Sequence, residues 1–551
     1  MSDLFLFVRP PRPLWPFNSP ASAFWPPLAF ASMAAMLREQ IPDLRVEILD
    51  APAQEMGWRQ LTTQLRQRQP AFVGIGEEAV SCVEGLRLAR LAKDCGAQVV
   101  AGGCFFSHVA PQVLATGLID VVVHGEGELT IVELVQALRE RSSGALRKVN
   151  GISFQTAGFS PSPPLEGRPF SPQLRGVHGQ GWGGGEERTR STAASHISKL
   201  ASRVILAGEV ITTPPRELVQ DLDTLPFPAY DLLPVERYGA RSVNHPRLAA
   251  IELSRGCFGS CDFCVLWRQM GRFVGDRLVP QLRVKSPERL LEEVRILVRR
   301  YDRRYLGWVD PCFNADPRVP GQLAELLLRD NLRVGQSAWV RTDAMVRDAH
   351  SGALASSVRA GLNEVYLGIE RPDSDSLAAL HKTSGVTDAR KALRILREDF
   401  PEVLAIGSFI YGLPGDSPQT IRAIHRLVNE LELDQFFFIP LTPLPGTREW
   451  RTELWDPTGE RFREFSFLPT GRPHGRHEEL ERALVWSLLT NWSRARVRNY
   501  FRQFFGSDPR RRRVQWRLAL RGAKVHLNHL LSKVIGQNES FGMIFPRWYE
   551  S

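Results

Sequence analysis

Three of the seven cysteines fall within eight residues, at Cys257, Cys261 and Cys264, with the spacing C-x3-C-x2-C. Thiolates are soft ligands that suit iron–sulfur clusters, and three of them can hold three irons of a cubane. No fourth cysteine follows close by in the sequence, so one iron would remain open to another ligand. Incomplete ligation of this kind suits a cluster that takes part in a reaction better than one that only carries electrons.

A zinc site is the other metal centre that clustered cysteines could form. Tetrahedral zinc takes four ligands, commonly from paired C-x2-C spacings, and the chain has no second pair. Three buried structural cysteines without a metal are the remaining alternative. The spacing favours the iron–sulfur cluster over both.

The spacing, with Phe263 just before the third cysteine, resembles the signature of the radical S-adenosylmethionine (radical SAM) superfamily. In that family the open iron binds the amino and carboxylate groups of SAM. The resemblance implies a [4Fe-4S] cluster held by Cys257, Cys261 and Cys264, with SAM on its open iron and Phe263 among the cofactor contacts.

The whole chain has 551 residues, of which 43% are hydrophobic and 24% charged, and its formal net charge is +10. Its length allows several domains, and its composition is ordinary for a soluble globular protein. No apolar run approaches the ~20 residues that cross a bilayer, and the first residues lack the basic segment of a secretory signal. With few cysteines outside the cluster, these features predict a cytoplasmic protein.

Residues 1–145 alternate strand-like apolar runs with amphipathic stretches, which favours a parallel, doubly wound α/β sheet of the Rossmann type. Ligands of such sheets lie at the carboxyl ends of the strands. Glycines gather there, but the G-x-G-x-x-G fingerprint of dinucleotide binding is missing. The expected strands are Leu4–Val8, Val46–Leu49, Phe72–Ile75, Gln98–Ala101 and Val121–Val123.

This pattern resembles the cobalamin-binding domain that precedes many radical SAM domains, and the resemblance implies cobalamin contacts at the matching pieces. The chain has no D-x-H-x-x-G motif, so it offers cobalt no lower histidine ligand by that route, and Cys104–Ser107 departs from the family's usual pattern. A sheet kept only as a structural domain is the alternative. The matching residues are Trp25 in WPPL, Asp50 in LDAPA, Gly102, Gly103, and Gly125, Glu126 and Gly127 in GEGELT.

Residues 146–247 are predicted to link the two domains. Pro161–Arg190 is rich in Gly, Pro and Ser, a composition typical of a flexible insertion. Glu217–Asp231 resembles the segment that joins cobalamin-binding and radical SAM domains in this family, and its prolines suit a strap across a domain interface.

Strands and helices alternate again over residues 248–450. Six strands are expected, fewer than the eight of a closed TIM barrel, and they match the open, partial TIM-like (β/α)6 barrel that the resemblance implies. They are Leu248–Leu253, Tyr305–Val309, Val334–Val340, Glu364–Ile369, Ala405–Ile410 and Phe436–Pro440.

The carboxyl ends of these strands carry the remaining candidate residues. By resemblance, Glu370 lies near the ribose or amino group of SAM, and the GLPGD turn at Gly412 lies near its adenosine. Arg341 can pair a carboxylate with two hydrogen bonds, such as that of SAM. A structural salt bridge between Arg341 and Asp310 is the alternative.

Residues 451–551 lose the alternation and are predicted to form a helical domain that caps the barrel. Arginines are dense between Arg494 and Lys524, with Asp508 as the one acid and aromatic residues interleaved. The pattern fits a solvated basic face, or contact with an anionic membrane surface or nucleic acid. The apolar stripe Val525–Ile535 favours the membrane over nucleic acid.

The cofactor set predicts an enzyme that uses cobalamin to methylate an unactivated carbon of an apolar or aromatic small molecule, with a reductant such as flavodoxin or ferredoxin. CVLWR from Cys264, RVKSPERLLEEVRIL and YLGWVDP also resemble the anaerobic Mg-protoporphyrin monomethyl ester cyclase, so an oxidative cyclase is the second hypothesis. A non-catalytic iron–sulfur and cobalamin sensor that binds nucleic acid is the alternative from another class.

Overall fold

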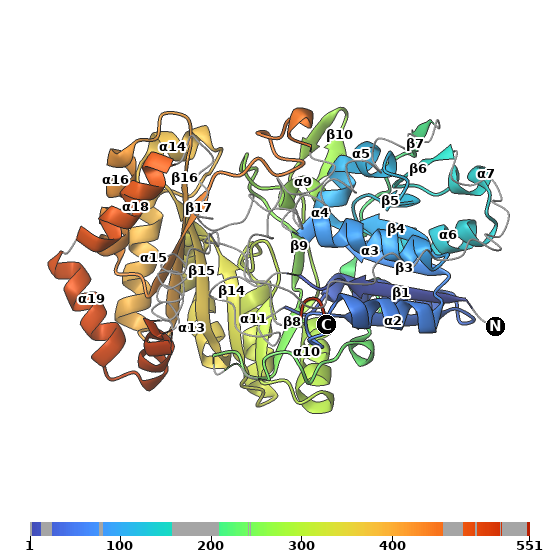
Figure 1. The fold of residues 1–551 in the computed structure, drawn as a ribbon. Coiled ribbons are helices and arrows are strands. Elements are labelled where there is room, and N and C mark those ends of the chain that lie inside the picture. The colour runs from blue at the N-terminus through green and yellow to red at the C-terminus, as the bar shows by residue number, and fades with distance from the viewer. Residues whose placement is uncertain are drawn as a thin grey trace, which may run out of the picture.

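Two α/β halves lie side by side in the computed structural model, the N-terminal half in blue and cyan and the second half from green to orange (Figure 1). The expected insertion Pro161–Arg190 and the apolar stripe Val525–Ile535 fall outside the residues that the structure describes. The structure describes residues 3–12, 25–76, 81–156, 209–240, 242, 244–455, 478–490, 493–517, 519–520 and 548–551.

The N-terminal half is built on one sheet with the strand order β2-β1-β3-β4-β5-β6-β7. Its first five strands pair in parallel, which confirms the doubly wound sheet and all five expected strands. The bounds are β1 (Leu4–Arg9), β2 (Arg45–Asp50), β3 (Phe72–Gly76), β4 (Gln98–Gly102) and β5 (Val121–Val123).

Two antiparallel strands extend this sheet, β6 (Ile152–Gln155) and β7 (Val210–Thr212). They stand on either side of the expected insertion in the sequence. The sheet of the N-terminal half therefore reaches beyond residue 145 into the segment that the sequence marks as a linker.

Helices cover both faces of the N-terminal sheet. Phe5 and Phe7 of β1 belong to one apolar core with α1 and α6, whereas Leu4 and Leu6 belong to a second core with α2 and α3. Burial on both faces is the normal state of a parallel sheet and explains the near-continuous apolar sequence of β1. The helix bounds are α1 (Leu28–Gln40), α2 (Trp58–Arg68), α3 (Cys82–Asp94) and α6 (Glu128–Arg139).

The second half is a six-stranded, all-parallel sheet with the order β8-β13-β14-β15-β16-β17. All six expected strands are present. Because β8 and β17 stand at the two ends of this order, the barrel is open. The bounds are β8 (Leu248–Ile251), β13 (Tyr305–Trp308), β14 (Gly335–Val340), β15 (Leu362–Glu370), β16 (Leu404–Tyr411) and β17 (Gln435–Pro440).

Amphipathic helices alternate with the barrel strands along the sequence, and these helices pack on the outer face of the sheet (Figure 1). The first begins as its sequence predicts, because the Ser286 hydroxyl accepts from the N–H of Arg289 at 3.1 Å and Pro287 occupies the first turn. The helices are α10 (Pro287–Arg295), α11 (Val319–Arg329), α12 (Thr342–His350), α13 (Ala353–Ala360), α15 (Val386–Asp399) and α16 (Pro418–Leu431).

The expected C-terminal helices are present as α18 (Glu478–Thr490) and α19 (Arg494–Phe505). They pack against the outer side of α16 rather than over the strand ends (Figure 1). His425 of α16 bonds the hydroxyl of Ser487 at 2.7 Å. In the described part of the chain, no helix is both long and apolar enough to cross a bilayer.

Several arginines of this region form ion pairs within the molecule, so they do not all belong to one uniform basic face. Arg498 pairs with Glu432, and Arg502 and Arg511 pair with Asp434 at 3.2 and 2.8 Å. These acids lie just after α16, far from the arginines in the sequence, so a local count of charges could not find them.

Residues 548–551 return to the N-terminal half and dock on α2 (Figure 1). The N–H groups of Trp58 and Arg59 donate to the backbone oxygens of Tyr549 and Ser551, at 3.0 and 2.9 Å. The Tyr549 hydroxyl donates to the buried Glu84 of α3 at 3.0 Å. The first turn of α2 thus has its unpaired N–H groups satisfied by a remote part of the chain.

Candidate active site at the strand ends of the barrel

The cysteine loop begins at β9 (Ser254–Gly256), directly after the first barrel strand. The buried Asp310, at the end of β13, accepts from the hydroxyl of Ser254 at 2.7 Å, and burial raises the pKa of Asp310 to about 7. Gly256 has a φ of +89°, and a Cβ there would overlap the backbone oxygen of Gln281. Glycine is therefore needed where the chain turns into the cysteine loop.

Cys257, Cys261 and Cys264 follow with their side chains partly buried. The sulfurs of Cys257 and Cys261 lie 3.7 and 4.0 Å from where a Cβ on Gly259 would stand. Within the described residues, no group of three or more His, Cys, Asp or Glu side chains is arranged to hold a single metal ion. A cubane takes each thiolate on a different iron, so three soft thiolates on one short loop fit a [4Fe-4S] cluster.

Cys312 lies beside this triad, a position that sequence spacing could not reveal. It is almost fully buried after β13, and its thiol donates a hydrogen bond that lowers the pKa of Cys257 to about 6. The two residues meet because β13 pairs with β8, the strand that leads into the cysteine loop.

Glu370 ends β15 with a φ of +66°, a region uncommon for residues with a side chain. Its carboxylate accepts from Ser408 at 3.2 Å and Lys382 at 3.4 Å, and burial raises its pKa. A Cβ on Gly368 would stand 2.7 Å from Glu370 and 2.8 Å from Lys382. Backbone strain of this kind is typical of functional sites. Lys382 is not among the site residues that the sequence predicts.

Arg341 is buried at the end of β14 and reaches the cysteine loop. Its guanidinium lies 4.5 Å from the ring centroid of Phe258. It donates twice to Asp343, at 3.0 and 2.7 Å, and once to Thr383 at 2.6 Å. The sequence alternative, a salt bridge with Asp310, is therefore not formed. Arg341 borders the cluster loop, and its pairing with SAM stays a prediction.

Gly412 opens the GLPGD turn with a φ of +89°. Its N–H donates to Asp416 at 2.7 Å, and the same carboxylate receives Arg371 at 2.6 Å in a buried ion pair. The Asp416 carboxylate, itself paired with Arg371, thus fixes the conformation of the turn. Phe263, partly buried in the cysteine loop, and Gly412 both lie at the end of the barrel that carries the cysteines, and their cofactor contacts remain predictions.

The glycines of the N-terminal half also stand at strand ends. Gly102 ends β4 beside Gly76 of β3, and Gly103 begins the short helix α4 (Gly103–Phe106). Gly125 has a φ of +66° and open space where a Cβ would point, whereas a Cβ on Gly127 would stand 2.7 Å from the sulfur of Met33. The positions suit a ligand at this edge of the sheet.

Asp50 and Trp25 make contacts beyond their own sheet. Asp50 is fully buried and accepts from Arg9 at 2.6 and 2.9 Å and from the hydroxyl of Tyr238 at 2.6 Å. The indole of Trp25 lies against Gly307 of β13, where a Cβ would come within 1.8 Å of the ring. Both side chains therefore join the N-terminal half to later parts of the chain.

His108 lies at the boundary between the halves. Its Nδ1 bonds the carbonyl oxygen of Cys104 at 2.9 Å, and a Cβ on Gly446, after β17, would stand 2.4 Å from its Nε2. Burial lowers the pKa of His108. The ring is thus held by the barrel on one side and by its own loop on the other.

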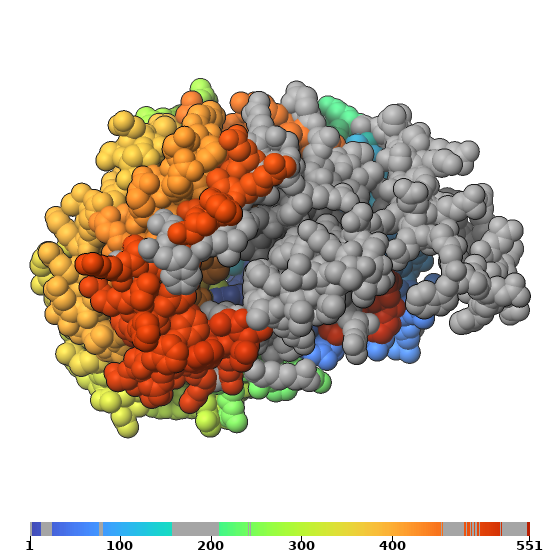
Figure 2. Space-filling view, turned by 60° about the vertical axis from the view of Figure 1, so that its left-hand side comes forward, coloured from blue at the N-terminus to red at the C-terminus, as the bar shows by residue number. Residues whose placement is uncertain are grey.

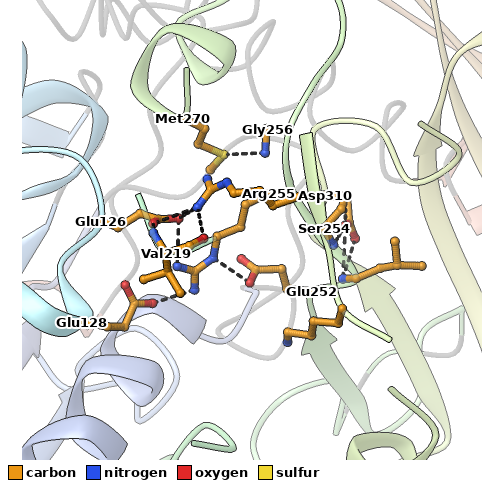
Figure 3. Close-up of polar contacts among 12 residues, drawn as sticks. Glu126, Glu128, Val219, Glu252, Ser254, Arg255, Gly256, Met270 and Asp310 are labelled. Atoms are coloured by element: carbon orange, nitrogen blue, oxygen red, sulfur yellow. Dashed lines mark hydrogen bonds and ion pairs between the residues drawn. The ribbon is translucent and has the colours of Figure 1, made fainter. Parts of the chain in front are cut away.

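An ion network joins the two candidate cofactor regions (Figure 3). Arg255, two residues before Cys257, donates to Glu126 at 3.1 Å, Glu128 at 2.6 Å and Glu252 at 2.9 Å. Arg283 of the barrel half also donates to Glu126 at 2.7 Å. The carboxylate of Glu126 is therefore occupied by protein contacts, and the loop after β5 is fixed to the base of the cysteine loop.

Two family models match the chain, and they divide it as its fold does. The model described as the radical SAM superfamily matches residues 251–428, and the model described as the B12 binding domain matches residues 18–135. The first match contains the cysteine triad, Arg341, Glu370 and Gly412. The second contains the glycine-bearing strand ends of the N-terminal sheet.

Two similar relatives and one solved structure extend these matches. The anaerobic magnesium-protoporphyrin IX monomethyl ester cyclase of Rubrivivax gelatinosus is 22% identical over 89% of this chain and 77% of its own. The hopanoid C-3 methylase of Methylococcus capsulatus is 26% identical over 81% and 73%. The structure of the radical SAM methyltransferase TsrM from Kitasatospora setae, with cobalamin and a [4Fe-4S] cluster bound, has a TM-score of 0.60 at 17% identity over 90% of each chain, and it shows the same fold.

Proposed function

We propose, since the chain belongs to the radical SAM enzymes that carry a B12-binding domain, that it methylates an unactivated carbon of an apolar or aromatic small molecule. The cofactors supply the radical cleavage of SAM and a transferable methyl group. A small-molecule substrate and an external reductant, such as flavodoxin or ferredoxin, complete the system.

The observation that carries this proposal is the joint between the halves. Glu126 and Glu128 contact Arg255 at 3.1 and 2.6 Å, two residues from Cys257. A methyl donor at the strand ends of the N-terminal sheet would then face the same interior as the cysteine loop. Methyl transfer needs such a fixed geometry, because the reacting groups must be held in line and away from water.

The chain's own residues have supporting tasks in this scheme. The three cysteine thiolates hold the cluster, and Asp310 and Arg341 fix the two sides of their loop through Ser254 and Phe258. Glu370, paired with Lys382, offers a buried acceptor to SAM. In this scheme, the share of these residues is binding and orientation.

Labelled SAM distinguishes this proposal from the cyclase alternative. The reconstituted enzyme, with dithionite, methyl-labelled SAM and an extract of its native cells, is expected to move label into product and to form S-adenosylhomocysteine and 5′-deoxyadenosine in equal amounts. A cyclase would give 5′-deoxyadenosine without matching S-adenosylhomocysteine, and oxygen from labelled water would enter the product. That second pattern would overturn the methylation proposal.

We also propose that the C-terminal helices touch an anionic membrane surface. Phe501 and Phe505 of α19 are 63% and 66% exposed, and the ring of Phe505 lies 5.9 Å from that of Trp516, which is 46% exposed. Arg513 and Arg517, which are close to Trp516 in the sequence, are also exposed. Figure 2 shows the helices, in red, on the outer face of the barrel half. Aromatic rings beside arginines are typical of interfacial helices.

Vesicle binding tests this contact. The protein is expected to float with vesicles of phosphatidylcholine and phosphatidylglycerol but not with phosphatidylcholine alone, and the double variant Phe501→Ser/Phe505→Ser should lose flotation. The matched control is Phe273→Ser, because Phe273 is 61% exposed on the remote hairpin of β10 (Arg272–Val274). Equal flotation of both variants and the wild type would refute the proposal.

A further inference from the structure

Trp339 of β14 faces the interior of the barrel. Successive residues of a strand point to opposite faces of the sheet, so Trp339 shares its face with Arg341, whose guanidinium contacts the cysteine loop. On the opposite face, Gln336 accepts from the indole of Trp308 and donates to the end of α13 at Ala360, at 2.9 and 3.1 Å. That face is covered by helices, and the face with Trp339 is the inner one.

Trp339 is nevertheless 40% exposed, an unusual state for a tryptophan in an inner strand of a sheet. Its indole stacks on the ring of Tyr366, with ring centroids 4.8 Å apart and an angle of 27° between the planes. The register of β14 and β15 pairs the two residues directly. The hydroxyl of Tyr366 donates to Glu364 at 2.7 Å, so the pair is fixed while one side of it stays accessible.

Apolar groups continue this surface on the neighbouring strand. Val309 follows β13, is 39% exposed, and stands beside Trp339 because Gly307 pairs with Ser337 two residues earlier. Gly307 lies on the same inner face, and the indole of Trp25 from the N-terminal half rests against it. Trp25 is itself 36% exposed. Two halves of the molecule therefore contribute to one aromatic interior wall.

The wall lies directly below the candidate SAM residues. Arg341 is two residues beyond Trp339 along β14, which corresponds to roughly 7 Å at the rise of a β-strand. Glu364, at the foot of the wall, contacts His245 at 3.0 Å and Arg510 at 3.7 Å. His245 and Arg510 thus compensate the charge of Glu364. The wall itself presents rings and methyl groups to a bound molecule.

We propose that Trp339 and Tyr366, with Val309 and Trp25, form the substrate-binding wall of the enzyme, and that the substrate presents an uncharged flat or fused ring to it. The inference rests on the proposed function and names the substrate class of the same site. Stacked rings gain attraction beyond the apolar area they bury. A charged substrate group would find no opposite charge on this wall and would lose its hydration there.

The test uses 1-pyrenemethanol, an uncharged flat fluorescent ring, and its anionic counterpart 1-pyrenesulfonate. Titration of the anaerobically reconstituted enzyme is expected to show one saturable site for the alcohol and much weaker binding of the sulfonate. Trp339→Leu, which keeps an apolar side chain but removes the ring, should weaken binding of the alcohol roughly tenfold, and Trp339→Phe should restore most of it.

Trp486→Leu is the matched control, because Trp486 is 67% exposed on α18, outside the barrel. It should bind 1-pyrenemethanol like the wild type, and the paramagnetic resonance of the reduced cluster should be unchanged in Trp339→Leu. Unchanged binding in Trp339→Leu, or an equal loss in Trp486→Leu, would overturn the inference.

The labelling experiment separates this inference from the proposed function. If probe binding depends on Trp339 but the wild type transfers no methyl group, the proposed function is refuted and the aromatic wall is supported. If Trp339→Leu transfers methyl groups at the wild-type rate, the proposed function is supported and the role of the aromatic wall is refuted.

Discussion

Replacing Cys257, Cys261 or Cys264 with alanine is expected to abolish the iron–sulfur cluster and, with it, all cleavage of SAM. In a cubane held by three cysteines each thiolate takes a separate iron, so the loss of one would leave two ligands for the whole cluster. The three residues share one loop that is anchored by Asp310 and Arg341, and the loop itself should stay folded. Iron and sulfide content, the brown absorbance and 5′-deoxyadenosine formation measure the outcome.

Cys312→Ala is the matched control for the cysteine variants. Cys312 contacts Cys257 and is almost fully buried, so its removal changes the same neighbourhood without removing a predicted ligand. The control should keep its full iron content. Wild-type iron in Cys257→Ala, with iron lost only when Cys312 is also replaced, would show that Cys312 can take over as ligand and would contradict the assignment of the triad.

The second large effect is expected for Arg255→Met, which should cost about 3–5 kcal/mol of the free energy of unfolding. Burial lowers the pKa of Arg255, but Glu252, Glu128 and Glu126 more than reverse this. The guanidinium is therefore charged and compensates three carboxylates that are themselves largely buried. Methionine fills a similar volume and leaves those carboxylates without their central partner. Chemical denaturation followed by circular dichroism measures the change.

Arg295→Met provides the comparison. Arg295 also pairs with two acids, Asp330 and Glu292, but all three lie at the surface of the barrel half. Water solvates these groups when the pair is broken, so stability should hardly change. If Arg255→Met were no more destabilising than Arg295→Met, the network between the halves would have no structural importance. Small-angle scattering of Arg255→Met adds a second readout, because a loosened joint increases the radius of gyration.

The strands and the cluster could be predicted from the sequence because each depends on residues that are close together in the chain. Short apolar runs such as Phe72–Ile75 indicate strands that are buried on both faces, and the three cysteines lie within one loop. Partners from distant segments leave no such record. Arg255 and Glu126 meet across the joint of two sheets, and Lys382 reaches Glu370 from a loop beyond the strand.

Some side-chain partners could not be predicted from the sequence, because contact depends on how each side chain is oriented in the folded structure. Arg341 pairs with Asp343 rather than with Asp310, which instead holds the start of the cysteine loop. Trp25 fits the family pattern of a cobalamin-binding segment, and its indole lies against Gly307 of the barrel. Neither contact follows from alternation or composition, since the first depends on the orientation of Arg341 at the end of its strand and the second on how the two halves pack.

The docking of Trp548–Ser551 on α2 has a consequence for synthesis on the ribosome. Tyr549 belongs to the same apolar core as Trp58 and Leu61, yet it is translated 465 residues after its partner Glu84. At ordinary rates of elongation this delay is roughly 25 to 90 seconds. Throughout that time the nascent N-terminal half lacks Tyr549 in its core and the backbone oxygens that accept from the first turn of α2. The surface of α2 that receives Tyr549 is therefore completed only after residues 548–551 have been synthesised.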